Sequence, residues 1–92
     1  MPKVLQIGPY VLFFWINDSD EPVHIHVALR RPAENATKFW LTQNGGCILA
    51  SNGSAISKKD LRSLAEAITC NHALICRRWT EYFGRDHLRF YA

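Results

Sequence analysis

The sequence of 92 residues contains no apolar segment long enough to form a membrane-spanning helix. Its longest uninterrupted apolar run, residues 10–16, has seven residues, whereas a membrane-spanning helix needs about 20. The chain also begins without the ordered basic, apolar and small-residue regions of a secretory signal. We therefore expect a cytoplasmic protein that has no membrane among its partners.

The cysteine content is low and the net charge is small. The three cysteines, Cys47, Cys70 and Cys76, include no Cys-x-x-Cys pair, so the sequence indicates neither a disulfide framework nor a zinc knuckle. The net charge of +3 permits contact with nucleic acid or an acidic protein without requiring either. Apolar residues, by contrast, make up 48% of the chain, which excludes a disordered tail and indicates one domain spanning residues 1–92.

The first 55 residues are predicted to form a meander of antiparallel strands. Apolar residues there alternate with polar ones or occur in short bursts separated by Gly, Pro and Asn, which is typical of strands joined by turns. The expected strands are residues 4–7, 10–16, 23–29, 38–42 and 47–50. Because residues 10–16 are apolar at every position, we expect a central strand covered on both faces.

Residues 56–84 have apolar side chains at helical spacing. Ser57 is the expected N-cap, Asn71 leaves open either one long helix or two helices that meet there, and Gly84 is the expected end. Residues 85–92 are too apolar for a free tail, so they should dock on the domain or on a partner. The predicted fold is α+β: a four- to five-stranded antiparallel sheet, followed by one long or two shorter C-terminal helices packed on one face.

Two histidines occupy alternate positions of the predicted strand at residues 23–29, and successive side chains of a strand point to opposite faces. One face is expected to pack under the helices and carries four aliphatic side chains: Val23, Ile25, Val27 and Leu29. The other face carries His24, His26 and Arg30, which should therefore point away from the helices.

The neighbouring strands add a basic side chain and aromatic rings to this face. Alternation in residues 38–42 directs Phe39 and Leu41 inward, so Lys38 and Trp40 should lie beside the histidines. An aromatic ring from residues 13–15 is expected on the same face.

The histidine pair has three interpretations. In a metal-free acid/base site, both rings would transfer protons while Lys38 or Arg30 stabilised a phosphate, as in RNA cleavage. In a metal site, the pair would need a third ligand, for which the candidates are Asp18, Asp20, Glu21, His72 and His87. In a structural role, the rings would pack on Trp40 and bond to nearby loops or lie in an interface. The structural role is the commonest for clustered histidines, and we expect neither a metal nor a cofactor.

Five segments, in their order along the chain, resemble a small bacterial family catalogued as domain of unknown function four-one-six-zero. These segments are residues 1–8, 10–18, 21–27, 38–41 and 79–84. The most specific is the Pro-x-His-x-His-Val motif at residues 22–27. The chain departs from the family in residues 71–78, which are apolar and basic where members usually carry an acidic stretch.

The resemblance implies a component of a toxin–antitoxin module, in some members the toxin, whose gene lies beside a small partner gene. It marks His24 and His26 as signature residues, and four others match lesser signature positions: Glu21, Pro22, Trp40 and Trp79. The resemblance implies no particular reaction.

The function expected from these observations is the toxin, or a toxin-like component, of a type II toxin–antitoxin module that acts on RNA. The expected activity resembles that of a metal-independent ribonuclease, with His24, His26 and Lys38 as catalytic residues. Arg30, Trp40 and Glu21 are the expected binding residues. The expected partner is a cognate antitoxin, with RNA or DNA as a further partner and self-association left open. The alternative is a non-enzymatic binding module or regulator that docks a partner protein or nucleic acid.

Overall fold

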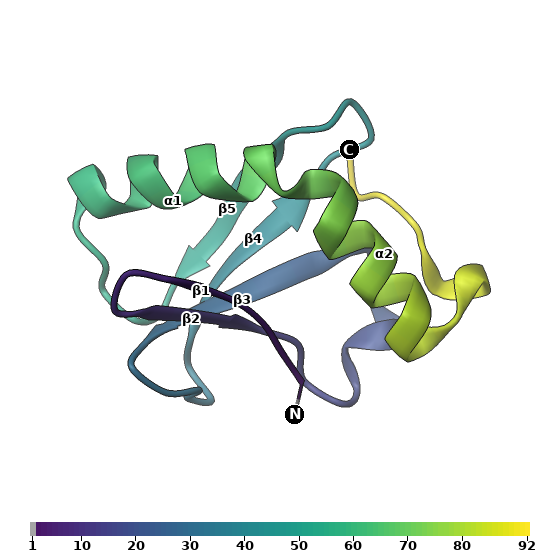
Figure 1. The fold of residues 1–92 in the computed structure, drawn as a ribbon, viewed down its shortest axis with the longest axis horizontal. Helices are drawn as coiled ribbons and strands as arrows, with labels where there is room; N and C mark the ends of the chain where they lie inside the picture. The colour runs from purple at the N-terminus through teal and green to yellow at the C-terminus, as the bar shows by residue number, and fades with distance from the viewer. Residues whose placement is uncertain (1) are drawn as a thin grey trace.

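The strands pair in the order in which they occur along the chain. The computed structural model describes residues 2–92 and contains one five-stranded antiparallel sheet with the order β1-β2-β3-β4-β5 (Figure 1). The strands are β1 (Lys3–Ile7), β2 (Tyr10–Phe13), β3 (His24–Leu29), β4 (Thr37–Leu41) and β5 (Cys47–Asn52). Short connections between sequential strands favour this meander, and it agrees with the predicted α+β class.

The second strand is shorter than the apolar run that predicted it. β2 ends at Phe13, and Ile16 is 75% exposed, so the expected length of seven residues is wrong, whereas residues 11–14 are buried on both faces of the sheet as expected. The Phe14 N–H still donates to the Pro2 carbonyl, but the Trp15 N–H donates to the Asp18 carboxylate at 2.7 Å. The backbone therefore leaves the sheet at this point. The prediction was too long because an apolar run indicates burial of the side chains and does not show which groups the backbone is hydrogen-bonded to.

Two helices follow the sheet, which resolves the alternative left open at Asn71. Helix α1 (Lys58–Cys70) and helix α2 (His72–Phe83) meet at Asn71, whose backbone N–H and side-chain amide both donate to the Ala67 carbonyl. Ser57 caps α1 by accepting the Asp60 N–H at 3.2 Å, and α2 ends at Gly84, where φ is +102°. Neither helix is long and apolar enough to cross a membrane, within residues 2–92.

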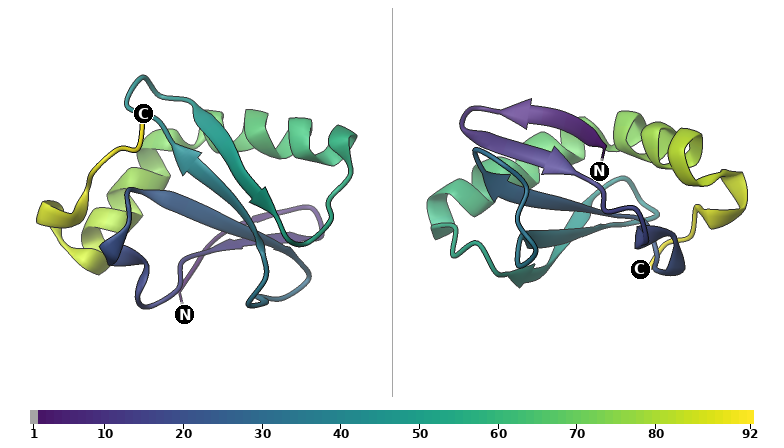
Figure 2. Two further views of the ribbon diagram at one scale, coloured as in Figure 1. Left: turned by 180° about the vertical axis from the view of Figure 1, so that it is seen from behind. Right: turned by 90° about the horizontal axis from the view of Figure 1, so that it is seen from below.

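The main core lies between the helices and one face of the sheet (Figure 2, left). The predicted inward residues of β3 and β4 lie in it, together with side chains from β2 and both helices: Leu12, Phe14, Val23, Ile25, Val27, Phe39, Leu41, Leu64, Ile68, Ile75 and Trp79. Leu29 is an exception at 51% exposure, because β3 ends there and the next residue adopts a positive φ. Tyr82, which lies within the predicted helical residues 56–84, is also exposed.

The C-terminal segment docks on the domain, which is one of the two arrangements expected from its apolar sequence. It begins with a short 3-10 helix, η2 (Arg85–His87), and its backbone then accepts hydrogen bonds from the sheet. The Val23 N–H donates to the Arg89 carbonyl at 2.7 Å, and the Gln43 N–H donates to the Ala92 carbonyl at 2.9 Å. These bonds hold residues 88–92 across the end of the sheet at which β3 begins.

Candidate functional site

The strand register brings the predicted aromatic and basic neighbours to the two histidines. His24 lies opposite Trp40, and His26 lies opposite Lys38 on one side and Phe13 on the other. The face predicted by strand alternation is therefore present in the sheet.

His24 nevertheless lies entirely within the protein, with 0% exposure. Its ring contacts the rings of Trp40 and Trp79, with centroids 5.5 and 5.3 Å away. The His24 Nδ1–H donates to the Pro22 carbonyl at 2.8 Å. Residues 17–22 and the C-terminal segment fold over this end of the sheet, so the position that alternation directs outward is not on the surface.

His26 lies beside His24 and is slightly more accessible, with a side-chain exposure of 12%. Its ring stacks on Phe13 at a centroid distance of 5.5 Å and meets the His24 ring edge-on at 4.9 Å. Both imidazoles thus belong to one cluster with aromatic walls.

Asp18 joins the two rings. It belongs to a short 3-10 helix, η1 (Asp18–Asp20), and its carboxylate oxygens lie 3.2 Å from His24 Nε2 and 3.2 Å from His26 Nε2. Burial alone would raise the pKa of Asp18, but the two imidazoles and the Trp15 N–H outweigh it and hold the pKa well below its usual value of 3.8. The carboxylate is therefore charged inside the protein. We call Asp18, His24 and His26 the Asp–His cluster.

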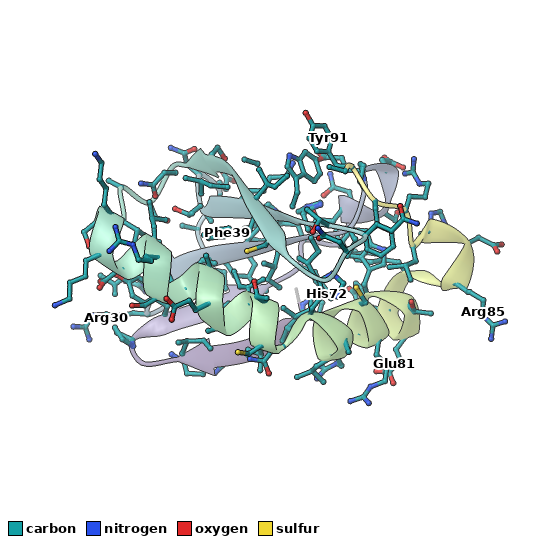
Figure 3. The ribbon with its side chains drawn as sticks, turned by 90° about the horizontal axis from the view of Figure 1, so that it is seen from above. Arg30, Phe39, His72, Glu81, Arg85 and Tyr91 are labelled. Carbon is teal, nitrogen blue, oxygen red and sulfur yellow. The ribbon has the colours of Figure 1, made fainter. Side chains whose placement is uncertain are left out.

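The sequence-predicted site residues are brought together with one exception. Lys38 forms an ion pair with Glu21, and its Nζ lies 4.1 Å from the centre of the Trp40 ring, so all three residues border the Asp–His cluster. Arg30 follows the last residue of β3, has a φ of +70° and is exposed. It lies at the far end of the strand from His24, roughly 20 Å away at about 3.3 Å per residue. Figure 3 shows Arg30 at one end of the molecule, at the left, well separated from Tyr91 at the upper edge.

The comparison with protein families shows the family of this chain. The family model described as Domain of unknown function (DUF4160) matches residues 10–80. The chain belongs to the DUF4160 family. No curated protein and no solved structure shows significant similarity to it. The matched range includes the whole Asp–His cluster.

Two features of this DUF4160 protein were not predicted from the sequence. Asp18 was one of five candidate partners for the histidines, and only the turn of η1 shows which carboxylate they contact. Tyr91 stacks on Trp40 with centroids 4.9 Å apart and an interplanar angle of 12°. No sequence signal connects residues 51 positions apart, although the apolar character of residues 85–92 indicated docking.

One cysteine of this DUF4160 protein lies close to a histidine. Cys76 Sγ lies 3.8 Å from His72 Nδ1, which the spacing of four residues along a helix explains. Burial raises the pKa of the Cys76 thiol, so the thiolate needed for nucleophilic attack is disfavoured.

Proposed function

We propose that this DUF4160 protein is the toxin-type component of a bacterial toxin–antitoxin pair and binds its antitoxin through the edge strand β5. The toxin–antitoxin role comes from the family resemblance. The choice of surface rests on one observation: β5 is an uncharged, apolar and exposed strand at the edge of the sheet.

An exposed edge strand presents unpaired backbone groups that can accept another strand. Proteins usually protect such edges with charge, proline or a bulge. The other edge of this sheet, β1, has both Lys3 and a register irregularity after it. β5, with the sequence CILASN, also has a register irregularity, at Ala50, but it has neither charge nor proline, and Ile48 and Leu49 are 43% and 42% exposed.

Two surface hollows flank β5 and meet at Cys47. One, of about 640 Å³, lies at the start of the strand and is lined by Thr42, Gln43, Asn44, Gly46, Cys47, Ile48 and Ala92. The other, of about 460 Å³, lies towards α1 and is lined by Cys47, Arg62, Ala65, Glu66, Thr69 and Cys70. An extended peptide that paired with β5 would place alternate side chains into hollows on the two sides of the strand.

The burial of His24 favours this binding function over RNA cleavage at the histidines. A catalytic acid or base must come within hydrogen-bond reach of the group that it serves. His24 has no exposed surface, its Nδ1 is bonded to the Pro22 carbonyl, and Lys38 is paired with Glu21. An RNA phosphate would have to displace η1 to reach this pair.

The binding proposal is tested by co-expressing the protein with the product of its neighbouring gene and measuring the affinity of the purified pair. Ile48→Lys should weaken binding at least about 10-fold and abolish rescue of growth, because it adds charge to the pairing edge. The matched control is Gln6→Lys, an exposed position on the opposite edge, which should bind as the wild type does.

Equal effects of the two variants would contradict β5 as the antitoxin site. So would a mass measurement in which Ile48→Lys converts a dimer of this chain into a monomer while antitoxin binding is unchanged. That result would assign β5 to self-association.

The toxin role is tested separately by expressing the chain alone and following growth. Wild type and His26→Gln should inhibit growth equally at equal folded protein levels. Absence of inhibition by the wild type would overturn the toxin role, and selective loss in His26→Gln would restore the catalytic alternative.

A further inference from the structure

We propose that Asp18, His24 and His26 form a binding site for a divalent transition-metal ion, with two imidazole nitrogens and one carboxylate oxygen as ligands. These donors suit zinc and neighbouring first-row metals. Within residues 2–92, this is the one group of three metal-ligating side chains whose donor atoms all lie within 4.8 Å of one another. The family match assigns no such site.

The spacing of the donor atoms agrees with a bound ion. Two ligands held about 2.0–2.1 Å from a tetrahedral zinc ion lie about 3.3 Å apart. Asp18 Oδ1 lies 3.2 Å from His24 Nε2 and 3.3 Å from His26 Nε2, so one carboxylate oxygen is at ligand spacing from both nitrogens. The folded chain thus already holds the carboxylate at ligand spacing from each ring.

The His24 ring is oriented as a ligand. Its Nδ1 lies 2.8 Å from the Pro22 carbonyl, which only accepts, so the proton of the ring is on Nδ1 and a neutral His24 has a lone pair on Nε2. A hydrogen bond from the second ring nitrogen to a backbone carbonyl is the usual support of a metal-bound histidine. Pro22 and His24 are therefore placed by the Pro-x-His spacing itself.

The ligand nitrogen of His24 lacks a partner. His24 Nε2 is buried and makes no hydrogen bond to any group of residues 2–92, whereas His26 Nε2 is hydrogen-bonded to Asp18 Oδ1 at 3.3 Å. A buried lone pair on Nε2 only 3.2 Å from a carboxylate oxygen is unfavourable unless a cation lies between them. Ligand atoms around an ion point at the ion instead of at one another, which accounts for the close approach without a hydrogen bond.

The charge of the cluster is complementary to a divalent cation. With neutral imidazoles the cluster has one negative charge, on Asp18, and the nearby Lys38 is already paired with Glu21. His26, the member with 12% side-chain exposure, lies on the side from which the ion and a water ligand would enter. A bound ion would fasten η1 to the start of β3.

The test begins with wild-type protein stripped of metal with a chelator. We expect one Zn²⁺ per chain in a calorimetric titration and a rise of at least about 5 °C in Tm at saturating zinc. Co²⁺ should give the visible absorption of a four-coordinate ion, and X-ray absorption should show nitrogen and oxygen ligands without sulfur. Absence of zinc binding at a 100-fold excess of Zn²⁺ over the protein would overturn the proposal. A proton between His24 Nε2 and Asp18 would then account for their close approach.

Four variants locate the ion. Asp18→Asn and His26→Gln should each weaken zinc binding at least about 10-fold. Asp20→Asn, in the same short helix, and Cys76→Ser, which removes the thiol beside His72, should bind zinc as the wild type does. Unchanged affinity in the first pair, or loss in Cys76→Ser, would overturn the assignment. If Asp18→Asn and His26→Gln fail to fold, X-ray absorption of the zinc-bound wild type tests the assignment instead. A sulfur ligand in that spectrum would contradict the site.

Discussion

The Asp–His cluster and the β5 edge differ in both polarity and exposure. The cluster is polar and buried: Asp18 and His24 are 7% and 0% exposed. The edge is apolar and exposed, with Ile48 at 43%. Buried polar groups and exposed apolar groups are the two departures from ordinary burial that carry information. Here they fall in different places, so the two regions should have different roles.

The contrast separates stability from recognition. Polar groups in the cluster depend on one another for hydrogen bonds and charge balance, so removal of any one leaves the others unsatisfied. The edge strand β5 pairs with a single strand, β4, and five of its six residues are exposed. Substitutions in the cluster should therefore change the free energy of unfolding, and substitutions on the edge should change binding.

The largest expected effect is that of His24→Ala. Loss of a fully buried ring leaves a cavity beside Trp79 and removes a partner of Asp18, so the free energy of unfolding should fall by about 3 kcal/mol. Chemical denaturation followed by tryptophan fluorescence, in the presence of chelator, measures this. His87→Ala, at an exposed ring, should change it by less than about 0.5 kcal/mol. Similar losses of unfolding free energy in His24→Ala and His87→Ala would contradict the proposed difference between buried and exposed positions.

A smaller effect is expected for Asp18→Asn under the same metal-free conditions. The amide still accepts the Trp15 N–H but removes the charge between the two rings, which should cost about 2 kcal/mol. Asp20→Asn, exposed in the same 3-10 helix, serves as the control and should be close to the wild type. A neutral result for Asp18→Asn would show that the cluster contributes nothing to stability without an added ion.

A hydrogen-bonded carboxylate outside the cluster should contribute less. Tyr10 donates to Asp60 at 2.6 Å, and this hydrogen bond, with burial and the charge of Asp60, raises the pKa of Tyr10 above 10.0. Tyr10→Phe should cost about 1 kcal/mol at neutral pH. Because the folded-state pKa exceeds the unfolded one, this contribution is complete below about pH 10 and lost as the pH rises through the folded pKa. Denaturation at pH 8–11 should show a decline in wild type that is smaller in Tyr10→Phe and in Asp60→Asn, where the part that remains comes from Cys47 and Cys76, whose pKa values burial also raises.

The smallest effect on stability is expected for Ile48→Lys, the variant with the largest effect on antitoxin binding. Its free energy of unfolding should stay within about 0.5 kcal/mol of wild type, because the side chain is on the exposed edge. Thermal denaturation of Ile48→Lys beside Gln6→Lys measures this. A loss above about 2 kcal/mol would show that β5 is part of the core and not a free binding edge.

Local patterns predicted much of the fold and the composition of the histidine face. Alternation in residues 23–29 placed Ile25 and Val27 in the core, and the register confirms Trp40 and Lys38 beside the histidines. The cap at Ser57 and the stop at Gly84 were correct because both depend on neighbours within a few residues. The predictions failed at the ends of elements: Ile16 lies beyond the end of β2, Leu29 is the last residue of β3, and both are exposed.

The site was only half predictable, because alternation gives the direction of a side chain but not what lies above it. His24 points to the expected face, yet η1 and residues 88–92 cover it, and the five acidic or histidine candidates were equivalent until η1 brought Asp18 to the rings. The amino-acid sequence thus specified the sheet, the helices and which residues share a face, since these follow from spacing of a few residues. Burial of the Asp–His cluster and exposure of β5 depended on how distant segments pack, because a loop and a C-terminal segment close one end of the sheet and leave its last strand uncovered.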